Sequence, residues 1–161
     1  MLLRLLIFCT INLLPVFLTA QQVKVIDFKY LEPYLQPTSD TIFVINFWST
    51  WCKPCVEELP IFASAETALK SAKVKFIMVS IDFSKNINTQ LIPFLKKNKV
   101  PGQVLLLKDL DYDNWIGKIN ESWDGTIPAT VISTQKERIF IGHAIADPNE
   151  LLGPIKSLLV N

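Results

Sequence analysis

The sequence predicts an α/β fold in which a mixed β-sheet is flanked by helices on both faces. Strand-like apolar stretches alternate with helix-like stretches from residue 23 to residue 123. Two more strand-like stretches, joined by a tight turn at 134–137, are followed by a closing helix. An order of βα units, then a hairpin, then a helix indicates a sheet that contains both parallel and antiparallel strands.

The first half of the chain is built from βα units. Residues 23–36 form a short lead-in, strand or helix, that ends before Pro37. Residues 41–48 are apolar on both faces, which is typical of a buried parallel strand. A helix is expected over 53–72, with Pro54 tolerated in its first turn. The next predicted elements are a strand over 74–81 and a helix over 89–99.

The second half contains shorter elements. Residues 104–107 predict a third strand. The mostly polar stretch 109–123 carries Trp115, Ile116 and Ile119 at helical spacing, which predicts a short helix. Trp115 and Trp123 are expected to be packing residues. The remaining predicted elements are the strands 129–133 and 138–141 and the helix 149–160, which Asp147 or Asn149 is expected to cap.

The N-terminus predicts a secretory signal peptide over residues 1–20. Arg4 supplies a short positive region, an apolar stretch follows, and Ala20 provides a small residue before the expected cleavage point. The apolar stretch is short for a membrane span, so an uncleaved anchor is the alternative. Residues 21–161 then form one domain, which is expected to be exported to the periplasm or cell envelope.

The charge balance of the chain argues against a nucleic-acid partner. The whole chain has 16 basic and 15 acidic residues, and removing Arg4 with the signal peptide leaves 15 of each. A chain with no net charge and interspersed charges has no electrostatic footprint for nucleic acid or for an acidic membrane surface. We therefore expect no nucleic-acid partner.

Cys52 and Cys55 are the only cysteines after the predicted signal peptide, and they follow a strand directly. A pair at C-x-x-C spacing where a strand passes into a helix is a redox dithiol signature. Helix N-termini carry unpaired N–H groups and partial positive charge, which stabilise a thiolate. A disulfide across one helical turn constrains almost nothing, so the pair is better interpreted as reactive than as structural.

The motifs around this pair resemble the thioredoxin fold. The sequence Trp-Cys-Lys-Pro-Cys at 51–55 follows a hydrophobic strand, Pro60 lies in the next helix, and Ile-Pro-Ala-Thr at 127–130 opens a later strand. The chain is more specifically similar to the exported TlpA/ResA-type branch. The segment between Cys55 and Pro128 is longer than in ordinary thioredoxins by about one βα unit, which the resemblance implies is an insertion before the cis-proline strand.

Two polar residues add to the resemblance with the TlpA/ResA-type branch. Asn46 stands where ordinary thioredoxins carry a buried aspartate, and Glu58 matches a glutamate found near the dithiol in that branch. The resemblance implies that Glu58 handles protons for the cysteines. The alternative is that Glu58, like Glu57, is a solvated charge in the first turn of the helix.

The resemblance also implies roles for the other site residues. Cys52 would attack a client disulfide and Cys55 would resolve the mixed disulfide, leaving the client reduced. Cys52 is then expected to be exposed and Cys55 to be buried. Pro128 would be cis, and the backbone of Ile127 would pair with the client like an added strand. The residues expected to border the client are Trp51, Lys53, Pro54, Ile127 and Pro128.

The resemblance implies no small-molecule cofactor beyond the Cys52–Cys55 disulfide. It implies protein disulfides as substrates and an upstream dithiol electron donor borne by the membrane. Cytochrome c maturation is a common task in this branch. Two alternatives stay open: an oxidase or isomerase of exported proteins, and a metallochaperone or binding module in which His143 joins the two cysteines.

Overall fold

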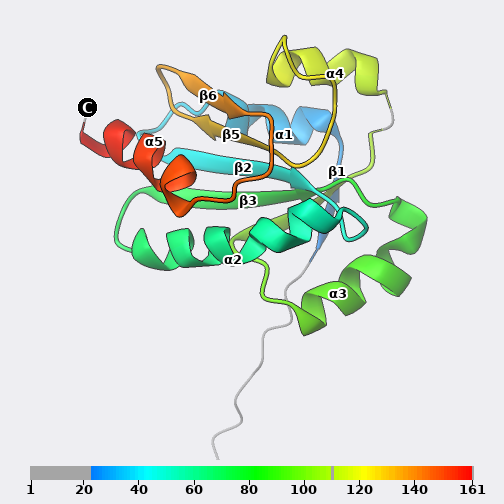
Figure 1. The fold of residues 1–161 in the computed structure, drawn as a ribbon. Coiled ribbons are helices and arrows are strands. Elements are labelled where there is room, and N and C mark those ends of the chain that lie inside the picture. The colour runs from blue at the N-terminus through cyan, green and yellow to red at the C-terminus, as the bar shows by residue number, and fades with distance from the viewer. Residues whose placement is uncertain (1–22, 110, 161) are drawn as a thin grey trace, which may run out of the picture.

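The computed structural model describes residues 23–109 and 111–160, so the predicted signal peptide lies outside the described residues. Six strands form one sheet in the order β1-β4-β3-β2-β5-β6, with helices on both faces (Figure 1). The strands are β1 (Lys24–Ile26), β2 (Ile42–Trp48), β3 (Val74–Ser80), β4 (Gln103–Leu107), β5 (Ala129–Ser133) and β6 (Arg138–Ile141). The helices are α1 (Phe28–Leu35), α2 (Lys53–Ala68), α3 (Ile92–Lys97), α4 (Tyr112–Ile119) and α5 (Pro148–Val160).

The sheet is mixed, as the sequence predicts. β2 pairs in parallel with β3 and antiparallel with β5, while β1, β4 and β3 are all parallel to their neighbours. β5 and β6 form the predicted antiparallel hairpin. The β4–α4 unit stands between α3 and β5, where the expected insertion before the proline strand belongs. The fold is therefore thioredoxin-like with one added βα unit.

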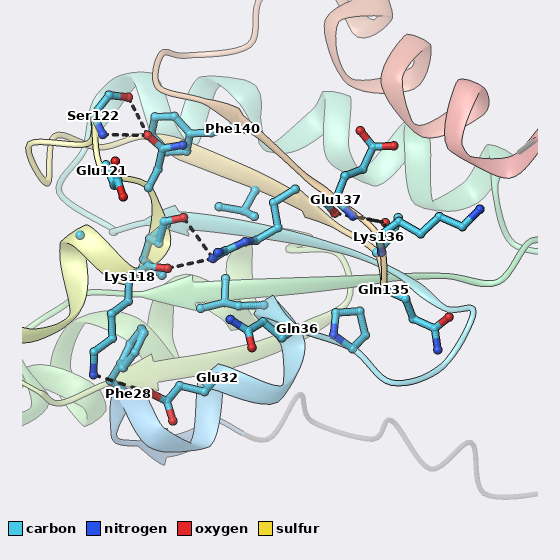
Figure 2. A pocket seen from close by; sticks show the side chains of 18 residues that line it. Phe28, Glu32, Gln36, Lys118, Glu121, Ser122, Gln135, Lys136, Glu137 and Phe140 are labelled. Carbon is cyan, nitrogen blue, oxygen red and sulfur yellow. Dashed lines mark hydrogen bonds and ion pairs between the residues drawn. The ribbon is translucent and has the colours of Figure 1, made fainter.

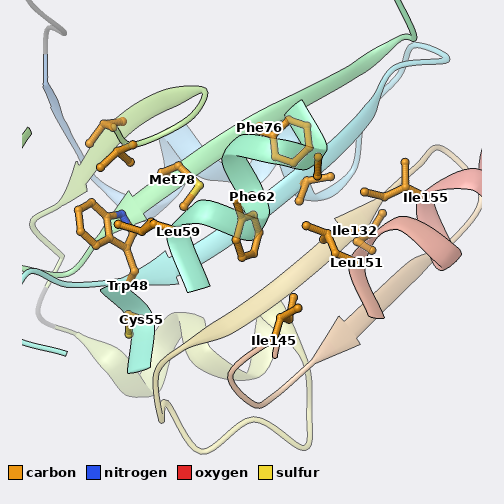
Figure 3. Packing of buried hydrophobic residues seen from close by; sticks show 14 of the residues in the cluster. Trp48, Cys55, Leu59, Phe62, Phe76, Met78, Ile132, Ile145, Leu151 and Ile155 are labelled. Atoms are coloured by element: carbon orange, nitrogen blue, oxygen red, sulfur yellow. The ribbon is translucent and has the colours of Figure 1, made fainter. Parts of the chain in front are cut away.

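Two apolar layers cover the sheet, and β2 contributes to both. Val44 and Trp48 belong to the cluster formed with α2, α3 and α5, whereas Ile45 and Phe47 belong to the cluster formed with α1 and α4. This alternation follows from the two-residue period of a strand. Figure 3 shows the first cluster, in which Trp48 lies near Cys55 at the start of α2. The start of α2, which carries the two cysteines, is therefore packed against buried apolar side chains of this cluster.

Aromatic rings fill the second cluster. The ring of Trp115 lies 5.7 Å from that of Phe28, 6.3 Å from that of Phe47 and 6.0 Å from that of Trp123. Both tryptophans are buried. The added α4 helix is thus fixed to the sheet by stacked and tilted ring contacts, whose centroid separations are typical of favourable aromatic pairs.

Two predicted helix boundaries are wrong. α2 ends at Ala68 instead of residue 72, because the chain continues in turns in which the Lys70 N–H donates to the Thr67 carbonyl and the Ala72 N–H to the Leu69 carbonyl. The helical segment predicted over 89–99 starts earlier, with a 3₁₀ turn at Ser84–Asn86 and a π turn at Ile87–Leu91 before α3. In the part of the chain that the structure describes, no helix has the length and apolar character needed to cross a membrane.

Candidate redox site

The dithiol lies where β2 ends and α2 begins. Cys52 is the N-cap of α2, and its Sγ accepts a hydrogen bond of 3.3 Å from the backbone N–H of Cys55. The two cysteines form a disulfide bond. A sulfur in this position faces the unpaired amides and the positive end of the helix, so the reduced Cys52 is stabilised as a thiolate.

The two sulfurs differ in burial, although less than the sequence suggests. Cys55 is fully buried, as expected, and Cys52 is only 6% exposed. The expectation of an exposed Cys52 is therefore wrong for this disulfide form. Its Sγ is covered on one side by the bond to Cys55 and on another by the Ile127 carbonyl, whose oxygen lies 3.8 Å away.

The proline loop stands beside the dithiol. The Ile127–Pro128 peptide bond is cis, as expected from the resemblance. β5 begins directly after this bond, and Ala129 pairs with Phe47 near the end of β2. This register brings the Ile127 carbonyl to the same edge of the sheet as Cys52. The arrangement places a backbone acceptor next to the sulfur that would attack a client.

Glu58 is a buried link between three segments of the fold. Its side chain is 2% exposed, which rules out the alternative of a solvated surface charge. Oε1 accepts from the Asn46 side-chain amide at 2.8 Å, and Oε2 accepts from the Ile145 N–H at 2.8 Å. Burial raises the pKa of Glu58 above its ordinary value, while the hydrogen bonds from Ile145 and Asn46 and the proximity of His143 partly offset the rise.

The raised pKa of Glu58 has a consequence for stability. Glu58 binds its proton more tightly in the folded chain than in the unfolded chain. Its contribution to the free energy of unfolding is therefore fully present below the unfolded pKa of about 4.3 and is lost as pH rises through the folded pKa. We expect the free energy of unfolding of Glu58→Gln, relative to the parent, to increase as pH rises from about 4.3 through the raised pKa of Glu58. Urea denaturation at several pH values measures this difference, and a pH-independent difference contradicts it.

Asn46 connects Glu58 to the proline strand. Its Nδ2 donates to Glu58 and, at 3.1 Å, to the Thr130 hydroxyl, while its buried Oδ1 has no partner. Asn46 and Thr130 are paired residues of β2 and β5, which explains the contact. The sequence pointed to Asn46 and Glu58 separately. It did not predict that the backbone of Ile145 contacts Glu58. Thr130 belongs to the Ile-Pro-Ala-Thr motif, but its contact with Asn46 was not predicted either.

Sequence reasoning missed Asp82, a second buried acid at this edge. Asp82 is 2% exposed and accepts hydrogen bonds from Thr50, in the loop that leads to Cys52, and from Ser80. One signal was available. β2 and β3 are adjacent parallel strands, so polar residues directly after each strand meet at the same edge of the sheet.

Of the residues predicted to border a client, Trp51, Lys53 and Pro54 are exposed, whereas Ile127 is half-buried and Pro128 is buried. Trp51 is 58% exposed, so its ring is available to a partner. Lys53 is exposed and its Nζ lies 3.6 Å from a Glu57 carboxylate oxygen. Pro54 occupies the first turn of α2. Phe83, which follows Asp82, is also 58% exposed and was not anticipated from the sequence.

His143 has a partner other than the cysteines. Its Nε2 lies 2.9 Å from the Glu150 carboxylate. The same carboxylate accepts from the backbone N–H of Asp147, while Asp147 accepts from the N–H of Asn149, so Asp147 caps α5. The His143 contact lowers the pKa of Glu150. Among residues 23–109 and 111–160, no group of three or more histidine, cysteine or acidic side chains is arranged to hold a metal ion.

The surface pocket of Figure 2 lies away from the dithiol. It has a volume of about 1290 Å³ and is lined by α1, the end of α4 and the β5–β6 turn. None of the predicted site residues lines it. Arg138 is one of its lining residues and donates to the carbonyl oxygens of Lys118, at 2.8 Å, and Ile119, at 3.3 Å, which satisfies the end of α4. The geometry that supports chemistry is therefore at the cysteines.

Known proteins are similar in sequence to part of this chain. The chain is 35% identical over 63 residues to sporulation thiol-disulfide oxidoreductase A of Bacillus subtilis, a match that covers 39% of this chain and 38% of that protein. It is 42% identical over 41 residues to the thiol-disulfide oxidoreductase ResA of Bacillus subtilis, covering 26% and 23%. The chain thus spans well under half the length of these curated relatives.

Solved structures match over most of the fold. A thioredoxin-related protein from Neisseria meningitidis serogroup B superposes with a TM-score of 0.64 at 25% identity, covering 79% of this chain and 91% of that one. A putative thiol:disulfide interchange protein DsbE from Chlorobium tepidum gives 0.62 at 17% identity, covering 80% and 84%, and supports the fold alone. The profile of the AhpC/TSA family matches residues 20–139. The chain therefore belongs to the AhpC/TSA family of thioredoxin-like proteins and is related to the ResA-type thiol-disulfide oxidoreductases.

Proposed function

We propose that this protein is an exported thiol:disulfide oxidoreductase that reduces disulfide bonds of client proteins. One observation carries the proposal: the Cys52 sulfur caps the N-terminus of α2 and lies 3.8 Å from the Ile127 carbonyl beside a cis-proline. A stabilised thiolate next to a backbone acceptor suits attack on a disulfide in an extended chain.

The reaction proceeds in two exchanges. The Cys52 thiolate attacks one sulfur of the client disulfide, and the other client sulfur leaves as a thiolate. The Cys55 thiolate then attacks the Cys52 sulfur of the mixed disulfide, which releases the second client thiolate and closes the Cys52–Cys55 bond. The client gains two electrons, which an upstream dithiol must replace. We propose that this donor is borne by the membrane.

Client binding uses the surface around the sulfurs. The backbone of Ile127 pairs with an extended client segment, as in the addition of a strand to a sheet edge. Pro128 keeps this loop beside Cys52, and Pro54 forms the adjoining surface at the start of α2. The exposed ring of Trp51 and the exposed Lys53 supply apolar and charged contacts at the rim.

Glu58 supplies a proton acceptor for the second exchange. Cys55 must lose its proton to become the attacking thiolate, and Glu58 is one helical turn further along α2. Asn46 cannot titrate, so it cannot serve as the base. Asn46 instead holds the Glu58 carboxylate through the 2.8 Å hydrogen bond.

The equilibrium redox potential tests the direction of electron flow. A protein that reduces clients needs a potential of roughly −200 mV or below on the scale of known dithiol proteins. We expect the Cys52–Cys55 couple, equilibrated with glutathione buffers, to have a potential in that range. A value near about −120 mV, as in DsbA, would favour the oxidase or isomerase alternative.

A turnover assay tests the activity itself. The purified protein, supplied with dithiothreitol, should accelerate the reduction of insulin disulfides over dithiothreitol alone. A double Cys52→Ser, Cys55→Ser variant is the control for any effect of the folded surface. Equal rates with the parent and the double variant would overturn the proposed function.

A further inference from the structure

The Asp82 carboxylate is buried, and both of its oxygens accept hydrogen bonds from neighbouring residues. It is 2% exposed. Oδ1 accepts from the Thr50 hydroxyl at 2.6 Å and from the Thr50 N–H at 3.2 Å. Oδ2 accepts from the Ser80 hydroxyl at 2.7 Å and from the Thr50 N–H at 3.1 Å. Burial of a charge is costly unless hydrogen bonds replace water, so this geometry is strongly specified.

These bonds join two loops at the edge of the sheet that holds the dithiol. Trp48 and Ser80 are paired residues at the ends of β2 and β3, and the Ile81 N–H donates to the Trp48 carbonyl at 2.9 Å. Beyond that point the sheet pairing stops, and the two segments that follow β2 and β3 separate, one leading to Cys52 and the other to Phe83. Asp82 and Thr50 form the next connection between them.

The segment that Asp82 holds leads directly to the attacking cysteine. Residues 49–51 are the whole connection between β2 and the N-cap of α2. Within it, the Cys52 N–H donates to the Ser49 carbonyl at 3.3 Å, so the turn is short and tight. Because Thr50 stands in the middle of this turn, fixing Thr50 fixes the direction in which the chain enters α2.

We infer that Asp82 is a positioning residue for the dithiol: through Thr50 it fixes the turn that places the Cys52 sulfur against the first amides of α2 and the Ile127 carbonyl. The inference rests on the proposed function. Disulfide exchange needs the attacking sulfur in line with the client disulfide, and a misplacement of about 1 Å can reduce a rate by about 10²-fold. Asp82 acts on the reaction through Thr50 and does not itself touch the sulfurs.

Thr50→Val is the sharpest test, because it removes the hydroxyl donor at 2.6 Å while the shape of residue 50 and Asp82 itself are retained. Asp82→Ala would also remove the acceptor of the Ser80 hydroxyl, which perturbs the edge of the sheet by a separate route. Thr50→Ser keeps the hydroxyl and serves as the conservative rescue. Thr67→Val is the matched control, because Thr67 is an exposed residue of α2 whose hydroxyl donates only to the Ala63 carbonyl, at 2.9 Å.

Three quantities are measured on each purified variant: the rate of insulin reduction, the alkylation rate of reduced Cys52 by iodoacetamide at pH 7, and the equilibrium constant with glutathione. We expect Thr50→Val to lower the first two by about tenfold or more and to shift the third, with Thr50→Ser and Thr67→Val close to the parent. The urea midpoint of each variant reports folding separately.

Unchanged alkylation and an unchanged glutathione equilibrium in Thr50→Val would overturn the inference, even if its urea midpoint falls, because the residue would then be only structural. Failure of the proposed function has a different signature. In that case the parent does not reduce insulin, while the alkylation and glutathione measurements still compare Thr50→Val with Thr50→Ser.

Discussion

The Cys55→Ser variant should accumulate mixed disulfides with client proteins, and the Cys52→Ser variant should accumulate none. Cys52 caps α2 and faces the proline loop, so its sulfur is the one that a client can meet. Cys55 is fully buried and can reach only the Cys52 sulfur. Both variants should lose insulin reduction down to the background rate, because each exchange needs one of the two sulfurs.

Trapping is measured by treating each variant with a mixture of exported proteins under non-reducing conditions and by resolving the adducts by mass. The double Cys52→Ser, Cys55→Ser variant gives the level of non-specific capture. Equal trapping by the two single variants would show that the attacking and resolving roles are assigned wrongly. Trapping by Cys52→Ser alone would reverse the roles.

Glu58→Gln should slow the resolving exchange by on the order of 10²-fold, the usual contribution of a positioned general base. Glutamine keeps the size of the side chain and an oxygen that can accept from Ile145, but it cannot take a proton. Attack by Cys52 does not need this group. The mixed disulfide should therefore form at the parent rate and persist, which rapid mixing of the reduced protein with a model disulfide can follow.

The pH dependence of the resolving rate is an independent test of Glu58 as the proton acceptor. Burial raises the pKa of Glu58, so the carboxylate that accepts the proton is lost at a higher pH than for an ordinary glutamate. The resolving rate of the parent should fall as pH drops through that raised pKa, and Glu58→Gln should lack this fall. Glu57→Gln is the matched control, since Glu57 is exposed and paired with Lys53. Superimposed profiles for all three proteins would leave Glu58 without a role in proton transfer.

The parts of the fold that local sequence patterns encode could be predicted. The strands β2, β3 and β5 are mostly apolar stretches, and the Cys-Lys-Pro-Cys sequence marks the start of α2. The cis bond before Pro128 and the added βα unit followed from family resemblance. Helix ends were less predictable, because α2 passes into turns at Lys70 and Ala72 where no glycine or proline marks the end.

The polar contacts that complete the site could not be predicted from one sequence. Glu58 meets a backbone N–H that lies 87 residues further along the chain, and Thr50 meets Asp82 32 residues further along. No local periodicity encodes such contacts, since they exist only after β2, β3 and β5 have paired. The burial of Cys52 escaped prediction for a similar reason, because the Ile127 carbonyl that covers it comes from a distant loop.

The hydrogen bond from Ile145 to Glu58 gives the site a spectroscopic reporter that needs no label. The Ile145 N–H donates to the carboxylate at 2.8 Å, and Ile145 is itself buried, so its amide proton senses the charge on Glu58 and little from solvent. In nitrogen-15 correlated NMR spectra this single amide resonance would follow the ionisation of Glu58 through a pH titration. It would do so in the oxidised and the reduced protein alike, and thus separate the proton on the carboxylate from the electrons on the sulfurs.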